Sequence, residues 1–119
     1  MTNAARNESS IELMGDTFIV KPSFNTVARI EGALSEGVIS LGQKMVQGAL
    51  PISSMAVILH HMAASSGSRA PKVQDVGEHL MEVGIQRYAS DVSEFLLTAF
   101  QGRANMRSSN DVGEPNDET

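Results

Sequence analysis

Apolar residues recur at intervals of three and four along most of this chain, and glycines and prolines interrupt the pattern repeatedly. Such spacing places apolar side chains on one face of an α-helix. Glycine and proline are residues at which helices commonly end or begin. The pattern therefore predicts several short helices, and a length of 119 residues fits a single domain that contains them.

A short β-hairpin is expected before the first helix. The sequence is apolar from Ile11, breaks at Gly15 and Asp16, and continues with β-branched and aromatic residues. Gly and Asp favour turns, whereas β-branched and aromatic residues favour strands. We therefore expect strands at residues 11–14 and 17–21. Since an isolated hairpin is only marginally stable, it should pack on a helix or join another sheet.

About five helices are expected after the hairpin. Ser23 stands where an N-cap precedes the first helix, and Gly37 where that helix would close. The second helix is expected at residues 38–47, the third from Pro51, the fourth from an acidic cap at Asp75, and the fifth at residues 88–100. The residues expected to face the core are Phe24, Val27, Ile30, Leu34, Val38, Leu41, Met45, Ile52, Met55, Leu59, Met62, Ala63, Val76, Leu80, Val83, Tyr88, Val92, Phe95, Leu96, Ala99 and Phe100.

The two polar ends are set apart from this domain. Residues 1–10 are mostly small and polar and are expected to be flexible. Residues 103–119 contain few apolar residues, so they bury too little surface to offset the entropy of ordering them. The prediction is a mainly α fold: a single helical domain at residues 11–102 with a small N-terminal β-hairpin and about five short helices, followed by a disordered acidic tail.

Composition excludes several classes of function. The net charge is −5 and the nine Lys and Arg residues are scattered, whereas nucleic-acid binders present a basic face. The absence of Cys excludes disulfides, a thiolate zinc site and a cysteine nucleophile. No apolar run is long enough to span a membrane, and the N-terminus lacks the apolar stretch of a signal peptide. We expect a cytoplasmic protein that binds neither nucleic acid nor membrane.

The histidines are the first residues to test for chemistry. His60 and His61 are adjacent on a predicted helix, so their side chains diverge by about 100° and do not readily share one metal ion. His79 lies on another helix, and no serine occurs in a nucleophile-elbow pattern. We expect no metal, no cofactor and no catalytic residue. The enzyme alternative that stays open is a small hydrolase using these three histidines.

A second set of apolar residues lies beside the predicted core stripes. If exposed, these residues would form a patch suited to a partner helix or another apolar segment; if the bundle surrounds them, they belong to the core. The sequence leaves both interpretations open. The candidate partner-binding residues are Ile39, Val46, Val57, Ile58, Met81 and Ile85.

The order of the elements carries a family resemblance. A hairpin leads into the helix that begins at Ser23, glycines recur at the same points of the helical pattern, and a Gly-containing loop at residues 65–68 follows the two histidines. The closing helix ends in the run Phe95-Leu96-Leu97-Thr98-Ala99-Phe100-Gln101-Gly102. From Leu13 to Gly102 the chain resembles the tail-assembly-chaperone-like proteins of gene transfer agents and long-tailed phages, some of which are labelled tail tube proteins.

The resemblance implies a role in the morphogenesis of a phage-like tail. Such chaperones coat the tape-measure protein, keep it soluble and bring tail-tube subunits to it. The expected partners are therefore a tape-measure protein and tail-tube subunits, in the host cell during particle assembly. A structural tail component retained in the particle is the alternative, and self-association into a homo-oligomer stays open.

Overall fold

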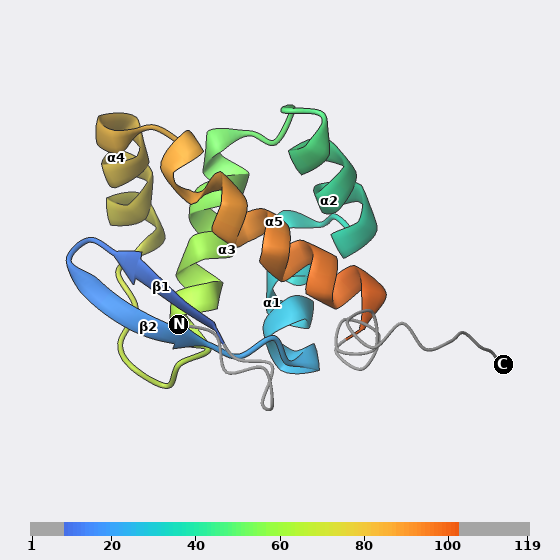
Figure 1. Ribbon diagram of the computed structural model, residues 1–119, viewed down its shortest axis with the longest axis horizontal. Coiled ribbons are helices and arrows are strands. Elements are labelled where there is room, and N and C mark those ends of the chain that lie inside the picture. Colours follow the sequence, from blue (N-terminus) through green and yellow to red (C-terminus); the bar gives the residue numbers. More distant parts are fainter. Residues whose placement is uncertain (1–8, 103–119) are drawn as a thin grey trace, which may run out of the picture.

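The computed structural model describes residues 9–102. It confirms the predicted fold class, because a two-stranded antiparallel hairpin precedes five helices (Figure 1). The predicted tail at residues 103–119 lies outside the described part. So does the predicted flexible N-terminus, except Ser9 and Ser10, which belong to the first strand. The elements are β1 (Ser9–Leu13), β2 (Asp16–Val20), α1 (Phe24–Leu34), α2 (Val38–Val46), α3 (Ile52–Ala64), α4 (Val73–Val83) and α5 (Gln86–Gln101).

The turn of the hairpin lies one residue earlier than the sequence predicts. Met14 and Gly15 both have positive φ angles, 55° and 91°, which is the pattern of a two-residue type I′ turn. Asp16 therefore does not lie in the turn but pairs with Leu13 across the two strands. This register places four side chains on the face that the helices cover: Ile11, Leu13, Phe18 and Val20.

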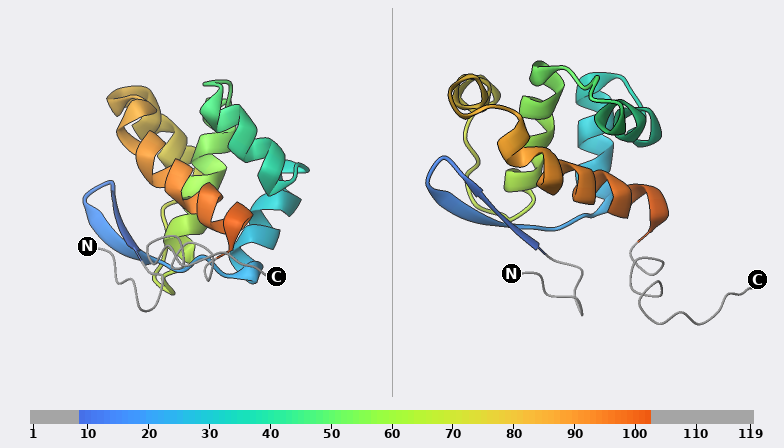
Figure 2. Two further views of the ribbon diagram at one scale, coloured as in Figure 1. Left: turned by 45° about the vertical axis from the view of Figure 1, so that its right-hand side comes forward. Right: turned by 45° about the horizontal axis from the view of Figure 1, so that its top comes forward.

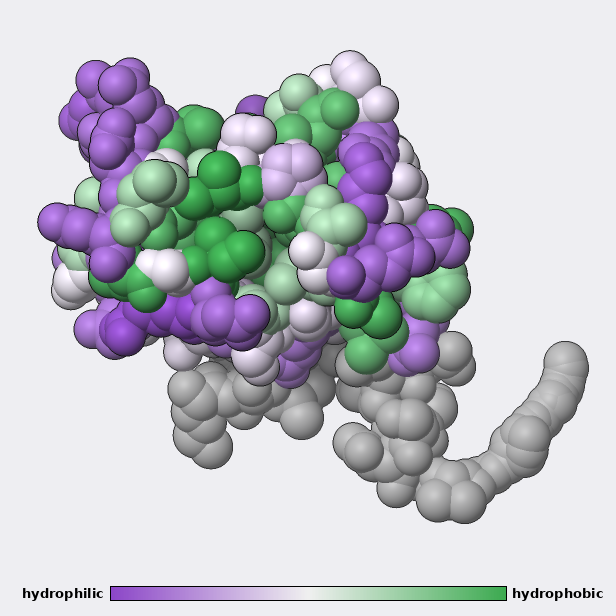
Figure 3. All heavy atoms as spheres, turned by 90° about the horizontal axis from the view of Figure 1, so that it is seen from above, coloured by the Kyte–Doolittle hydropathy of each residue, from purple (hydrophilic) through white to green (hydrophobic). Residues whose placement is uncertain are grey.

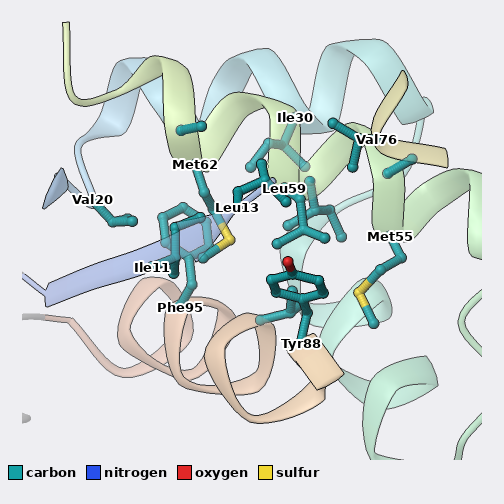
Figure 4. Packing of buried hydrophobic residues seen from close by; sticks show 14 of the residues in the cluster. Ile11, Leu13, Val20, Ile30, Met55, Leu59, Met62, Val76, Tyr88 and Phe95 are labelled. Atoms are coloured by element: carbon teal, nitrogen blue, oxygen red, sulfur yellow. The ribbon is translucent and has the colours of Figure 1, made fainter. Parts of the chain in front are cut away.

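The helix α3 is the centre of the molecule. The helices α1, α4 and α5 and the strand β2 all contact it. Figure 2 shows the hairpin and α4 at one end of the molecule and α1 and α2 at the other, with α5 running between them. In the core, Tyr88 and Phe95 of α5 point toward Leu59 and Met62 of α3 (Figure 4).

Helix boundaries follow the predicted signals in part. Ser23 is the N-cap of α1, and its hydroxyl accepts a hydrogen bond from the Thr26 N–H at 3.2 Å. The end of α1 is earlier than predicted, because Ser35 adopts the left-handed conformation there and Gly37 instead precedes α2. The helix α4 begins at Val73, so Asp75 lies in its first turn and is not its cap.

Several residues predicted for the core are exposed. Phe24 is 87% exposed because it lies six positions before the buried Ile30, which places it about 120° away around α1. Thr26 occupies the buried face of that turn instead. Phe100, in the last turn of α5, is 56% exposed. Ile52 and Val83 are also exposed, each at the end of its helix.

No helix within residues 9–102 combines the length and the apolar character that a membrane span requires. Seen from above, the molecule nevertheless presents apolar side chains at its surface between groups of hydrophilic ones (Figure 3). The chain therefore leaves apolar area in contact with solvent.

Candidate functional site: a groove between α2 and α5

An apolar hollow lies between α2 and α5. It has a volume of about 380 Å³ and opens to solvent. Its lining contains no charged residue. The residues that line it are Val38, Ile39, Gly42, Gln43, Met45, Val46 and Gln47 of α2 and Ser93, Leu96, Leu97 and Phe100 of α5.

The walls of the groove are exposed apolar side chains. On α2, Ile39 is 55% exposed and Val46 is 87% exposed. Leu97 and Phe100 are the exposed side chains of the α5 wall. Leu96 beneath them is buried and joins the groove to the hydrophobic core. Exposed apolar side chains gathered around one hollow are typical of a surface that another molecule covers.

Two small residues leave space between these walls. Gly42 lies in the interior of α2 and Ser93 on the facing side of α5. A Cβ atom added to Gly42 would meet no atom within 4 Å, so no packing contact in the described structure requires a glycine there. A glycine in a helix interior destabilises the helix by about 1 kcal/mol relative to alanine. Its presence in the groove is therefore unexplained by the fold.

Polar contacts from the last turn of α1 and from the α1–α2 connection hold the α2 wall in place. The carboxylate of Glu31 accepts a hydrogen bond from the Val38 N–H at 2.8 Å, so it caps α2 where Gly37 has no side chain to do so. Glu36 forms an ion pair with Lys44 at 2.8 Å and accepts a hydrogen bond from the Ser40 hydroxyl. These bonds to Lys44 and Ser40 lower the pKa of Glu36 below its usual value.

The six residues proposed from sequence do not form one surface. Ile39 and Val46 line the groove, whereas Met81, 72% exposed, lines a separate hollow along α4. Ile58 is fully buried, so the prediction that it contributes to a partner surface is corrected: α3 is covered on several sides, and Ile58 belongs to the core. Ile85 is partly buried against the core, and Val57 is of intermediate exposure.

Sequence reasoning missed the α5 wall. It assigned Phe100 to the core and did not single out Leu97. The available signal was the spacing of Ser93, Leu97 and Phe100, which lie four and three residues apart and therefore share a helix face. That face borders the core face of Leu96, and α2 packs beside it.

The hollow along α4 differs in chemistry. Its volume is about 410 Å³, and three carboxylates line it together with two methionines and a histidine. The residues are Met14, Asp75, Glu78, His79, Met81 and Glu82. Acidic side chains along a helix usually form a solvated face, and within residues 9–102 no group of three or more His, Cys, Asp or Glu residues could hold a metal ion.

Two of the three histidines make hydrogen bonds, and the third contacts a neighbouring histidine ring. His60 Nδ1 is hydrogen-bonded to the Pro71 carbonyl oxygen at 2.7 Å, and His79 Nε2 to the Tyr88 hydroxyl at 3.0 Å. The rings of His60 and His61 contact each other edge to face, with centroids 4.9 Å apart. Burial, and then the nearby charges of His60 and Arg29, lower the pKa of His61. These contacts connect the histidines to neighbouring segments of the fold.

The geometry of the groove is suited to binding an apolar surface, because exposed side chains surround an uncharged hollow. Comparison of the chain with protein-family models, with curated proteins and with solved structures gave no match.

Proposed function

We propose that this protein is an assembly chaperone of a phage-like tail, which binds the tape-measure protein and helps to recruit tail-tube subunits. The observation that carries the proposal is the uncharged groove between α2 and α5, with exposed apolar side chains on both walls. The resemblance of residues 13–102 to tail-assembly chaperones supplies the identity of the client. The proposed role is binding without catalysis, in the cytoplasm of the host cell during particle assembly.

The physical argument starts from the energy of the exposed walls. Fully burying an exposed apolar side chain is favourable by about 1.5–3 kcal/mol, and covering the half of Ile39 or Phe100 that is exposed gains roughly half of that. A monomer that leaves several such side chains around one hollow therefore gains free energy when a partner covers them. The acidic net charge of −5 keeps the free chains apart until that partner is present.

The test is an affinity pull-down of the tagged chain from cells that assemble particles, read by mass spectrometry. We expect a long helical tape-measure protein in the eluate and the absence of this chain from finished particles. Ile39→Asp should abolish the recovery, because it places a charge in the groove. Met81→Asp is the matched control, since Met81 is also exposed but lies outside the groove. An eluate free of particle proteins refutes the proposal.

One observation favours a second candidate, a structural component of the tail. The sheet that the structure describes has only two strands, so each strand has a neighbour on one side alone. Strands with a free edge can pair with strands of other subunits and so build a ring. Rings at micromolar concentration and the presence of the chain in purified particles would favour this candidate over the chaperone.

A further inference from the structure

Gly42 is the starting point, because its conformation does not require glycine. It has no positive φ angle, unlike Gly48 and Gly84, which end helices in conformations that other residues rarely adopt. At Gly77 in α4 an added Cβ would lie 3.9 Å from the Cβ of Ala56, which is an ordinary van der Waals contact. An added Cβ at Gly42 would meet nothing within 4 Å. Glycine at this position weakens α2, and no contact within residues 9–102 requires it.

The position of Gly42 indicates what approaches it. It lies between the exposed Ile39 and Val46 along α2, with Ser93 on the opposite wall. A row of small residues between two rows of larger ones is a groove into which the ridge of another helix fits. Glycine allows the backbone of that helix to come close. A partner helix of two to three turns is long enough to span α2, which has nine residues.

The charged residues beside the groove indicate which charge the flank of the partner should carry. The lining is uncharged, so the contact face must be apolar. Glu94 stands one helical turn before Leu97, is exposed, and has no ion pair with any residue that the structure describes. On the other side, Lys44 is already paired with Glu36. A Lys or Arg on the partner would complement Glu94. A second copy is disfavoured at this face because it would bring a further net charge of −5 to it.

We propose that the α2–α5 groove takes one amphipathic α-helix of the client protein. A small residue of that helix packs against Gly42, apolar residues on each side of it contact the two walls, and a basic residue on its flank lies near Glu94. This inference rests on the proposed function, because it specifies the part of the client that the chaperone binds.

Two glycine substitutions form the central test. Gly32 and Gly42 both lie inside helices, and an added Cβ at either would meet no atom within 4 Å. Gly32→Ala and Gly42→Ala should therefore both raise the melting temperature. We expect Gly42→Ala to weaken binding of purified tape-measure protein at least tenfold, and Gly32→Ala to leave it unchanged. Equal affinities of the two variants overturn the inference. Recovery of the tape-measure protein by the wild-type chain in that case leaves the proposed function intact.

Photocrosslinking identifies the occupant directly. A benzophenone amino acid at Gln47, which lines the groove, is compared with the same residue at Gln74, an exposed position of α4. In cells that assemble particles, we expect the probe at position 47 to crosslink to a helical segment of the client and the probe at position 74 not to do so. A crosslinked pair of copies of this chain, or equal crosslinking from both positions, overturns the inference. A wild-type chain that captures no tape-measure protein overturns the inference and the proposed function together.

Discussion

Replacing Glu31 with alanine should destabilise α2, although Glu31 belongs to α1. Its carboxylate accepts the Val38 N–H at 2.8 Å and so binds one of the N–H groups that a helix N-terminus leaves without a partner. The negative charge also lies at the positive end of the α2 dipole. No side chain at Gly37 can substitute for it.

The magnitude follows from these contacts. Loss of a helix cap typically costs about 1 kcal/mol, and a hydrogen bond to a charged group contributes roughly 1.5–3 kcal/mol when it is well shielded. Glu31 is only half-buried, so the lower of these two values, about 1 kcal/mol for a helix cap, applies. Removing a negative charge from the last turn of α1 recovers a few tenths of a kcal/mol. We expect a net loss of about 1 kcal/mol, which lowers the melting temperature of a domain of this size by roughly 4–8 °C.

The assay is urea and thermal unfolding of the wild type, Glu31→Ala and Glu31→Gln, with Glu78→Ala as the control. Glu78 is exposed and makes no hydrogen bond or ion pair with the residues described. Glu31→Gln keeps an acceptor oxygen and should lose less. A serine placed at Gly37 in the Glu31→Ala background supplies a local cap and should restore part of the loss. Equal stabilities of Glu31→Ala and Glu78→Ala, or no rescue by Gly37→Ser, would refute the capping argument.

Two further predictions concern other parts of the fold. The pKa of His61 is lowered in the folded state, first by burial, so between that pKa and the usual value of about 6.5 the unfolded chain binds more protons. The contribution of His61 to the free energy of unfolding is therefore fully present above pH 6.5 and is lost as the pH drops through the folded pKa. Urea unfolding between pH 5.5 and 8 should show this slope, and His61→Gln should flatten it. Met14→Asn should stabilise the hairpin by about 0.5–1 kcal/mol, because asparagine tolerates the left-handed conformation that Met14 adopts at φ 55°. A lower melting temperature of this variant would contradict that account.

The sequence predicted the order and type of the elements because their signals are local. Ser23 caps α1 and Gly84 ends α4, and each acts within one or two turns of the chain. The errors concern positions where more than one local signal competes. Ser35 adopts a left-handed conformation that is usually left to glycine, although Gly37 follows two residues later. Met14 occupies the turn position that the sequence predicts for Asp16. Neither choice can be read from the periodicity.

The candidate site was predictable only in part, because exposure depends on which helices meet. Ile39 and Ile58 look alike in sequence, each lying beside a core stripe. The structure separates them, since α3 is covered on several sides whereas α2 packs chiefly on α5. Phe24 and Phe100 illustrate the reverse error, because both were predicted to face the core. Phe24 is turned about 120° away from the buried Ile30 around α1, and Phe100 lies in the last turn of α5 and is 56% exposed.

The contacts that hold α2 in the fold determine how the groove experiments distinguish a loss of client binding from a loss of stability. This helix has a single buried residue, Leu41, and its remaining support comes from partly buried Val38 and Met45 and from the carboxylates of Glu31 and Glu36. The α2 wall therefore depends on a small core contact and on polar bonds from the last turn of α1 and the α1–α2 connection. Glu31→Ala should reduce both the stability of the chain and its binding of the client. Gly42→Ala should raise the stability while it reduces binding, and this opposite pair of effects is the signature expected of a groove whose partner approaches the α2 backbone.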